Sequence, residues 1–277
     1  MHRFLALGPQ RLSLDRPRIM GIVNLTDDSF SGDGLAGQVE RAIAHAQRLI
    51  EEGADLIDLG AESSRPGAEP VAAAQELERL LPVLEGLRHC GVPLSVDTTK
   101  TEVMRAVLAA GASMINDIKA LREEGALEVI AASDCGICLM HMQGEPHTMQ
   151  LAPRYDDVVG EVAGFLRARL DACLAAGIAR ERLCIDPGFG FGKTLAHNLA
   201  LLRALPRLAA LGPPLLVGLS RKSMLGALTG RPVGERQAAS VAAALIAVQR
   251  GAAIVRVHDV AATRDALSVL ATLQEEA

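Results

Sequence analysis

Polar and charged residues stand at the ends of a series of short apolar runs, and their types suit the binding of a small, partly anionic molecule. Asp97, Asn116 and Asp186 carry carboxylate and amide groups, which can exchange hydrogen bonds with a planar heterocycle that has a guanidine-like edge. A second group offers cations and an amide suited to phosphate oxygens or to a phosphate-bound metal: Asn24, Arg65, Lys222, Arg256 and His258.

Most of these residues also have an ordinary structural explanation. Asp97 precedes Thr98 and could cap a helix, Asn116 could belong to a turn, and Arg65 or Lys222 could be a solvated charge. Arg256 differs because it lies within an apolar run, where an unpaired charge is costly. The sequence therefore favours a functional role for Arg256.

The stretch LCIDPGFGFGKT, residues 183–194, joins a short apolar strand, one carboxylate and a glycine-rich turn. It is not a phosphate-binding P-loop, because the glycine required five residues before GK[ST] falls on Pro187. It is not a dinucleotide fingerprint either, because Lys193 occupies the third glycine position. Two interpretations remain: Asp186 is presented to a ligand at a strand end, or it caps the next helix in a simple turn.

The apolar runs alternate with helical stretches. The runs are IMGIVN (19–24), DLIDLG (55–60), PLSVDT (93–98), MINDI (114–118), GICLMHM (136–142), LCIDPG (183–188), LLVGLS (215–220) and AIVRVH (253–258). Eight such units favour a closed (β/α)8 barrel, with an open doubly wound sheet as the alternative. Two short apolar segments around Gly8 and Pro9 predict a hairpin that closes one end. In a barrel, the carboxyl ends of the strands converge on one rim, where active sites of this fold lie.

The composition limits the possible setting and partners. The 28 Lys and Arg residues against 33 Asp and Glu residues give a net charge of −5, which argues against nucleic acid as a partner. The first residues lack the apolar core of a secretory signal, and no apolar run has the length of a membrane span, so we expect a cytoplasmic protein. The five Cys should then be reduced, with Cys135 and Cys138 in the core. Since nothing resembles a linker, we expect one domain over residues 1–277.

Two polar, glycine-containing segments follow the first two runs. They extend from Thr26 to Ala36 and from Ser63 to Pro70, and the first contains Phe30. Loops of this kind on a barrel rim are candidate lids that exclude water from a reaction.

Motifs along nearly the whole chain resemble those of the dihydropteroate synthases, a family of folate-pathway enzymes that join a dihydropterin methyl diphosphate to p-aminobenzoate. The matching segments are MGIVNLTDDSFSGDG (20–34), GAESSRPGA (60–68), SVDTTK (95–100), INDI (115–118), CLMHMQG (138–144), IDPGFGFGKT (185–194), LLVGLSRKSM (215–224) and RVHD (256–259). The resemblance implies a (β/α)8 barrel and a transferase that uses Mg²⁺, forms a homodimer and is a sulfonamide target.

The resemblance also implies a role for each site residue. In the pterin pocket it implies hydrogen bonds from Asp97, Asn116, Asp186 and Lys222, with Arg256 over the ring and Met140 and Phe191 in the walls. Around the diphosphate it implies Asn24, Arg65, Arg256 and His258, with Mg²⁺ bridging Asn24 and the phosphate oxygens. Ser64 and Ser220, with the two loops, would shape the p-aminobenzoate site.

Two residues depart from the family pattern. Asp27 stands where the first loop usually has proline, and Ser64 stands where the second loop usually has threonine. Both changes concern loops that close over the second substrate, so they bear on p-aminobenzoate affinity more than on pterin binding.

The residue types favour a reaction in which the leaving group departs first. Because an aniline nitrogen is weakly basic, catalysis should come mainly from Mg²⁺, Arg65, Arg256 and His258 neutralising the charge on diphosphate. Asp97 and Asp186 would stabilise the cationic methylene, which makes the expected step SN1-like. The residues expected to be catalytic are Asp97, Asp186, Lys222 and Arg256. The alternatives are a silent pterin-binding paralogue, a pterin-dependent methyltransferase barrel and a barrel without a site.

Overall fold

The structure is a computed structural model that describes residues 4–25, 34–63 and 70–275. In these residues, one parallel sheet contains β3 (Arg18–Asn24), β4 (Leu56–Gly60), β5 (Leu94–Asp97), β6 (Met114–Asp117), β7 (Gly136–Met140), β8 (Leu183–Asp186), β9 (Leu216–Val217) and β10 (Ile254–Val257). The strand order is β8-β7-β6-β5-β4-β3-β10-β9, and a parallel bridge between Ile185 and Leu215 joins the two ends. The predicted (β/α)8 barrel is therefore confirmed, and the open sheet is excluded.

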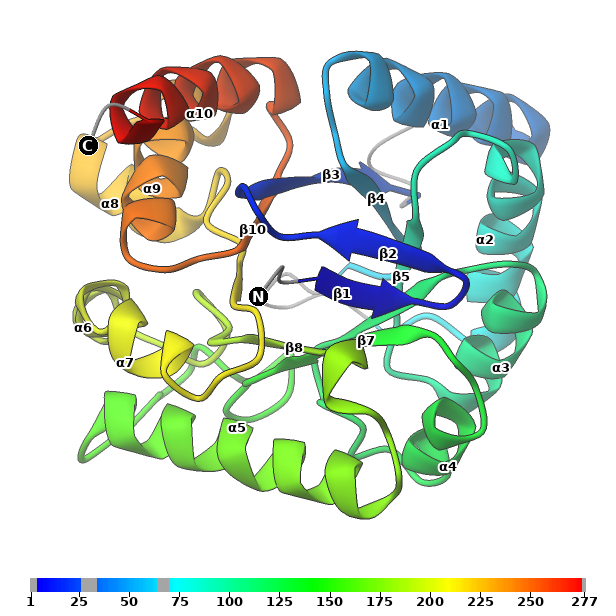
Figure 1. Cartoon of the computed structure of the whole chain (residues 1–277), viewed down its shortest axis with the longest axis horizontal. Helices are drawn as coiled ribbons and strands as arrows, with labels where there is room; N and C mark the ends of the chain where they lie inside the picture. The colour runs from blue at the N-terminus through cyan, green and yellow to red at the C-terminus, as the bar shows by residue number, and fades with distance from the viewer. Residues whose placement is uncertain (1–3, 26–33, 64–69, 276–277) are drawn as a thin grey trace.

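Helices surround the barrel on its outer side (Figure 1). They are α1 (Gly34–Glu51), α2 (Ala73–Leu87), α3 (Thr101–Ala109), α4 (Ala126–Ala131), α5 (Val158–Ala175), α6 (Leu195–Arg203), α7 (Leu205–Ala209), α8 (Ser223–Thr229), α9 (Gln237–Gln249) and α10 (Val260–Glu275), with the 3-10 turns η2 (Arg180–Arg182) and η3 (Val233–Glu235). Each strand of the barrel is followed by at least one helix, which is the alternation predicted from the sequence.

Burial on both faces explains why the short apolar runs form this sheet. Every residue of β4 and every residue of β7 is buried, as expected for strands between a packed barrel interior and a layer of helices. The helices contribute one apolar side each: α2 buries Leu80, Val83, Leu84 and Leu87 against the outer face. The carboxyl ends of the strands are thus held rigidly around one opening.

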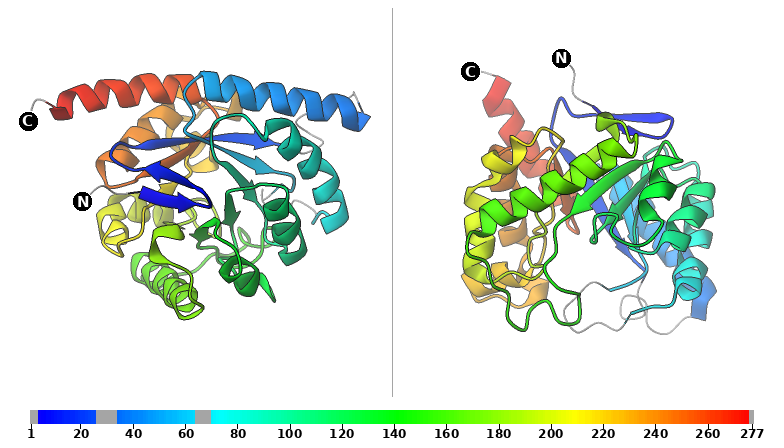
Figure 2. Two further views of the ribbon diagram at one scale, coloured as in Figure 1. Left: turned by 45° about the vertical axis from the view of Figure 1, so that its right-hand side comes forward. Right: turned by 90° about the horizontal axis from the view of Figure 1, so that it is seen from below.

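An antiparallel hairpin of β1 (Phe4–Leu7) and β2 (Gln10–Ser13) lies across the amino-terminal end of the barrel, as predicted. Figure 1 looks along the barrel and shows the hairpin over its centre, and Figure 2 shows the hairpin covering one end. We call the following buried cluster the barrel floor: Leu5, Leu7, Leu12, Met20, Leu56, Met114, Cys138, Cys184, Leu216 and Ile254.

A largely polar layer lies above the floor, toward the carboxyl ends of the strands. Residues two apart on a strand point to the same face and are separated by about 6–7 Å along it. Leu56 is followed in this way by Asp58, Met114 by Asn116, Cys138 by Met140, Cys184 by Asp186, and Ile254 by Arg256. We call Asp58, Asp97, Asn116, Met140, Asp186 and Arg256 the upper layer.

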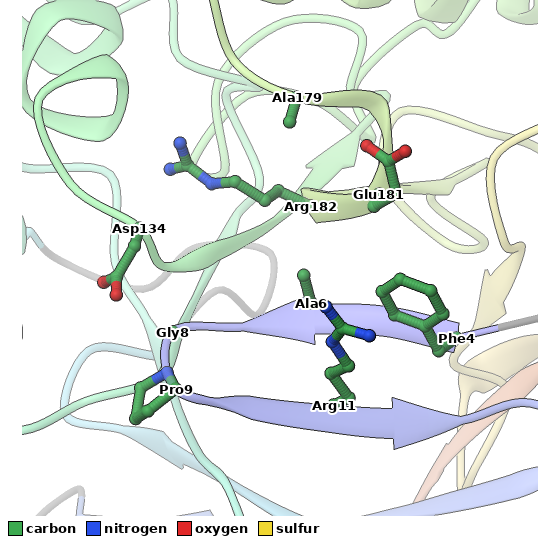
Figure 3. Close-up of a pocket in the computed structure, with 9 residues that line it drawn as sticks. All are labelled: Phe4, Ala6, Gly8, Pro9, Arg11, Asp134, Ala179, Glu181 and Arg182. Atoms are coloured by element: carbon green, nitrogen blue, oxygen red, sulfur yellow. The ribbon is translucent and has the colours of Figure 1, made fainter.

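A groove of about 470 Å³ lies outside the floor, between the hairpin and η2 (Figure 3). The Arg11 guanidinium carbon lies 4.7 Å from the centroid of the Phe4 ring. Arg182 donates hydrogen bonds of 2.7 Å to the backbone oxygens of Cys135 and Ile130. Two of the four charged residues that line the groove are therefore already engaged within the protein; the other two are Asp134 and Glu181.

The remaining expectations about the chain as a whole concern its thiols and its helices. All five cysteines are free, and Cys135 and Cys138 are buried, as predicted. Among the helices that the structure describes, none is both long enough and apolar enough to cross a bilayer.

Candidate active site

The centre of the upper layer is an ion-pair network around Arg256. Arg256 Nε donates to Asp58 Oδ2 at 2.6 Å, and Arg256 Nη2 donates to Asp97 Oδ2 at 3.1 Å. Asn116 Nδ2 donates to the same Asp58 oxygen at 3.0 Å. Four strands, β4, β5, β6 and β10, therefore supply one hydrogen-bonded group. The two carboxylates compensate the charge of Arg256, which allows it to interrupt an apolar strand.

Asp58 was not among the site residues predicted from the sequence. It is fully buried, and its second oxygen, Oδ1, has no hydrogen-bond partner in the described part of the chain. The signal was available, because an acidic residue within the apolar run LIDLG needs a compensating partner just as Arg256 does. Asp58 and Arg256 each account for the burial of the other.

Asp186 and Lys222 extend the upper layer on the side of β8 and β9. Asp186 ends β8 and is only 5% exposed. Lys222 Nζ donates to the backbone oxygen of Phe189. A Cβ added at Gly218 would lie 4.0 Å from Lys222 Nζ and 3.8 Å from Arg256 Cβ. Lys222 and Arg256 therefore both lie beside Gly218.

Burial and neighbouring charges shift the pKa values of this group. Burial raises the pKa of Asp97 to about 7; Arg256 opposes the shift and Asp58 adds to it. Burial also raises the pKa of Asp186, and Lys222 opposes that shift. Burial lowers the pKa of Lys222 to about 8, against the attraction of Asp186. Asp97 and Lys222 therefore titrate near neutral pH, as is common for residues of active sites.

Met140 and Phe191 form an apolar wall beside these charges. They pack in one cluster with Ile118, Met142 and Met149. Lys222 Nζ lies 4.8 Å from the centroid of the Phe191 ring, within cation–π range. Phe189 is instead fully buried in the main core. Of the two Phe residues in the glycine-rich stretch, Phe191 is thus the one beside Lys222.

The turn after β9 carries Ser220 and Lys222 on either side of a strained residue. Arg221 has a left-handed φ of 58° and forms an ion pair of 2.6 Å with Asp259. Ser220 Oγ accepts a hydrogen bond of 3.2 Å from the His258 backbone N–H and lies 3.0 Å from His258 Nδ1. Ser220 and His258 are therefore direct neighbours on the rim.

Asn24 lies at the end of β3, next to Gly60 of β4. A Cβ added at Gly60 would lie 3.9 Å from Asn24 Oδ1 and 3.7 Å from Asp97 Cβ, so Asn24 and Asp97 face each other across Gly60. The other predicted residues Ser64 and Arg65 lie outside the described residues, as do Asp27, Phe30 and Pro66.

Glu62, two residues after the end of β4, is engaged in an ion-pair cluster. It pairs with Lys100, which also contacts the buried Glu76 at 2.7 Å. Glu76 comes from α2, so the cluster ties the segment after β4 to the helix that follows it. These contacts give Glu62 a structural role at the edge of the site.

The oxygen atoms of the protein fit Mg²⁺ only if a bound substrate and water supply most of the coordination. Across residues 4–25, 34–63 and 70–275, no group of three or more His, Cys, Asp or Glu side chains is arranged to hold a metal ion. Asn24 offers one amide oxygen, which is a suitable hard ligand. Mg²⁺ commonly uses one or two protein oxygens together with substrate phosphates and water. The residues present match that arrangement.

The sequence matches a known family over most of its length. A family described as "Pterin binding enzyme" matches residues 20–258. The dihydropteroate synthase of Neisseria meningitidis serogroup C is 56% identical over 265 residues, which cover 94% of this chain and 94% of that protein.

Solved structures give the same result. Dihydropteroate synthase of Xanthomonas albilineans with 4-aminobenzoic acid is 55% identical with a TM-score of 0.93, covering 99% of each chain. The same enzyme in complex with 7,8-dihydropteroate is 54% identical with a TM-score of 0.89, covering 98% of each chain. The Yersinia pestis enzyme in a sulfonamide drug complex is 48% identical with a TM-score of 0.93, covering 98% of this chain and 99% of that one.

Proposed function

We propose how this chain carries out the reaction of its family, because it belongs to the pterin-binding enzymes and, within them, to the dihydropteroate synthases. These enzymes are transferases. The substrates are 7,8-dihydropterin-6-ylmethyl diphosphate and p-aminobenzoate, and the products are 7,8-dihydropteroate and diphosphate. The observation that carries the proposal is the upper-layer network of Arg256 with Asp58, Asp97 and Asn116, which lies beside Asp186 and Lys222.

The pterin binds in the upper layer. Its guanidine-like edge donates hydrogen bonds, and Asp97 and Asp186 are acceptors that face the interior of the barrel. Asn116 and Lys222 donate to the ring's acceptors, while Met140 and Phe191 provide the apolar wall for its faces. Arg256 is held by Asp58 and Asp97 and covers the ring.

The diphosphate binds nearer the rim, at Asn24, Arg65, Arg256 and His258. The contacts to Asp58 and Asp97 use two of the five donors of the Arg256 guanidinium, which leaves N–H groups for a phosphate oxygen. Ser220 holds His258 through its backbone N–H and its ring nitrogen. Mg²⁺ bound by Asn24 and the phosphate oxygens would neutralise charge on the leaving group.

The chemical step is dissociative. The bond between the methylene carbon and the diphosphate oxygen breaks, and its electron pair leaves with diphosphate. Asp97 and Asp186 stabilise the positive charge on the methylene and the ring, because the low dielectric of the interior strengthens the attraction. The amine nitrogen of p-aminobenzoate then bonds to that carbon and releases a proton to solvent. Asp97, Asp186, Lys222 and Arg256 are the catalytic residues of this scheme.

The p-aminobenzoate site lies at the rim, where Ser64 and Ser220 shape it. Sulfonamides carry a similar aniline ring and should compete for this site. The sulfonamide complex of the Y. pestis enzyme, which is 48% identical to this chain, supports that assignment.

One assay tests the reaction, and a second tests its mechanism. Purified protein with Mg²⁺ and both substrates should release diphosphate and form dihydropteroate. Binding of pterin without diphosphate release would identify a catalytically silent paralogue instead. For the dissociative step, labelled diphosphate should exchange into the pterin substrate faster than product forms, with a carbocation-like isotope effect at the methylene. Absence of both signals would contradict the SN1-like step.

We also propose that the protein is a homodimer. Apolar side chains are exposed on α8, α9 and α10: Leu228 (53% exposed), Ile246 (41%), Val269 (66%) and Leu273 (69%). Exposed apolar side chains on adjacent helices are typical of protein–protein contacts. Light scattering after size exclusion should give the mass of two chains, and Val269→Asp should shift it toward one chain. A monomer at micromolar concentration would contradict this proposal.

A further inference from the structure

Side-chain donors hold the backbone oxygens of the glycine-rich loop one after another. Lys193 Nζ donates to the oxygens of Gly188 and Phe191, each at 2.9 Å. The oxygens between and after them are bonded as well: that of Phe189 by Lys222, Gly190 by Gln150, Gly192 by Tyr155, and Lys193 by Asn198. The loop that follows Asp186 is thus fixed by side chains along its length.

Lys193 is the buried centre of this arrangement. It is 3% exposed, and its ammonium group has three N–H donors. The three nearest acceptors are the oxygens of Gly188 and Phe191 and His141 Nδ1, the last at 3.0 Å. Burial lowers the pKa of Lys193 to about 7. When Lys193 is protonated, His141 Nδ1 accepts in this contact and its ring is neutral, in agreement with the pKa of His141, which burial and Lys193 lower to about 3. The backbone oxygen of His141 is a fourth, more distant acceptor at 3.4 Å, so each donor of the ammonium group has an acceptor within reach.

The loop is also pressed against the end of β7. A Cβ added at Gly188 would lie 1.9 Å from the His141 oxygen, and one added at Gly192 would lie 2.3 Å from the Gln143 oxygen. Both glycines have positive φ, 68° and 62°. Residues other than glycine would not fit at these two positions, so the loop lies directly against residues 141–143.

The segment that Lys193 fixes is the one that touches two pterin-site residues. The Gly188 backbone N–H donates to Asp186 Oδ1 at 2.7 Å. Lys222 Nζ donates to the Phe189 oxygen and lies 4.8 Å from the Phe191 ring centroid. A change of position in residues 188–191 would therefore move the groups that orient the Asp186 carboxylate and the Lys222 ammonium.

We propose that Lys193, paired with His141, is a positioning residue for the pterin half of the reaction. Lys193 touches no substrate; it holds residues 188–191 so that Asp186 and Lys222 keep the geometry that binds the pterin ring. This inference rests on the proposed function. A purely structural role would also use these bonds, because an apolar side chain would leave the oxygens of Gly188 and Phe191 without this donor. The two roles differ in their effect on pterin binding.

The test compares two variants that each remove hydrogen bonds from the same loop. Lys193→Met keeps the length of the side chain and removes its donors. Tyr155→Phe removes the bond to the Gly192 oxygen, which lies outside the segment that touches Asp186 and Lys222. Each variant is assayed for thermal stability, for dihydropterin binding by calorimetry, and for KM of the pterin diphosphate and of p-aminobenzoate.

For Lys193→Met, we expect the pterin dissociation constant and the pterin diphosphate KM to rise about 10- to 100-fold, because small displacements of site groups have effects of this size. The KM of p-aminobenzoate should stay within about twofold, as should all three constants for Tyr155→Phe. Lys193→Met with lowered stability and unchanged pterin constants would overturn the proposal, as would an equal rise for both substrates.

A second variant covers the case in which Lys193→Met does not fold. His141→Phe removes the acceptor at Nδ1 and keeps a ring against Phe165, whose centroid lies 4.9 Å away. Its pterin constants should rise about 2- to 10-fold, the range expected for one lost hydrogen bond. Unchanged pterin constants in folded His141→Phe would also overturn the proposal. If the wild-type protein neither binds dihydropterin nor releases diphosphate, the proposed function fails, and the role of Lys193 fails with it.

Discussion

The floor and the upper layer of the barrel interior are built on the same strands, two residues apart, yet they are stabilised in opposite ways. The floor excludes water with Leu5, Leu7 and Leu12 of the hairpin packed on strand residues such as Leu56. The upper layer instead contains charges, and Arg256 is compensated by Asp58 and Asp97. A rigid apolar base lets the layer above it keep costly charged groups in fixed positions.

The comparison also explains why the site opens at only one end. At the floor, the hairpin packs apolar side chains onto those of the strands. In the upper layer, Asp58 Oδ1 is buried without a partner in the described residues, and Asp97 and Lys222 have pKa values near neutrality. Because the charges and polar atoms of these groups are incompletely compensated, a bound substrate that pairs with them gains binding free energy.

The largest expected effect is on the free energy of unfolding, when one residue of each layer is replaced in turn on the same strand. Asp58→Ala leaves Arg256 buried without one of its carboxylates, so it should lower the free energy of unfolding by about 3–5 kcal/mol and also raise the KM of the pterin diphosphate. Leu56→Ala, two residues below, should lower it by about 2–5 kcal/mol through a cavity, with pterin KM nearly unchanged. Urea unfolding and steady-state kinetics measure both. If Leu56→Ala raises pterin KM as much as Asp58→Ala, the layers do not have separate roles.

The next largest effect concerns β8 and the turn after β9. Asp186→Asn and Lys222→Ala should each lower kcat/KM for the pterin diphosphate about 100-fold, because Asp186 stabilises the cationic transition state and Lys222 donates to the acceptors of the pterin ring. The KM of p-aminobenzoate should change little. Cys184→Ala, on the floor below Asp186, is the matched control and should leave kcat/KM close to that of the wild type. Equal losses for both substrates would contradict this division of the site.

A smaller effect should appear in the pH dependence of pterin binding. Asp97 accepts with both oxygens and carries a negative charge only above its pKa of about 7, and Lys222 is a cation only below its pKa of about 8. Affinity should therefore rise as pH increases through about 7 and fall above about 8, by at most about tenfold per pH unit on each side. Calorimetry from pH 5.5 to 9.5 measures this. Asp97→Asn should remove the acidic limb; persistence of that limb would assign it to another group.

The smallest expected effect lies on the rim, at Ser220. Ser220→Ala removes one hydroxyl, so the KM of p-aminobenzoate should rise about 2- to 10-fold, the range for one hydrogen bond. The pterin dissociation constant should stay unchanged, since the hydrogen bonds of Ser220 Oγ join it to His258 on the rim. A rise confined to the pterin diphosphate would show that Ser220 acts through His258 alone.

The sequence predicted the barrel and much of the upper layer because both depend on local patterns. Short apolar runs separated by amphipathic helices predict strands buried on both faces, and a polar residue at a run's end predicts a side chain on the rim. Arg256 was identified in the same way, from a charge within an apolar run. Asp58 satisfied the same criterion but was missed, since the acidic residue in LIDLG was read as part of the strand alone.

Other features depend on contacts that no local pattern contains. Lys193 and His141 are 52 positions apart, and nothing in either motif indicates that one bonds the other. The left-handed backbone of Arg221 is similarly hidden, and the partner of its side chain, Asp259, is 38 positions away. The predicted strand 215–220 is shorter in the structure, where β9 is Leu216–Val217, because the chain turns early toward Lys222. Such features require knowledge of which segments meet in three dimensions.

The hairpin has a consequence for the order in which the protein can assemble. The ribosome delivers β1 and β2 first, yet their apolar side chains pack in one cluster with Ile254 of β10, near the other end of the chain. Gly8 N–H also donates to the oxygen of Asp134, in the middle of the sequence. The base of the barrel therefore cannot be completed during most of translation. Contacts this distant in sequence slow folding. Until the final strand emerges, the apolar side chains of the hairpin lack these partners, and exposed apolar surface of this kind favours aggregation and chaperone binding.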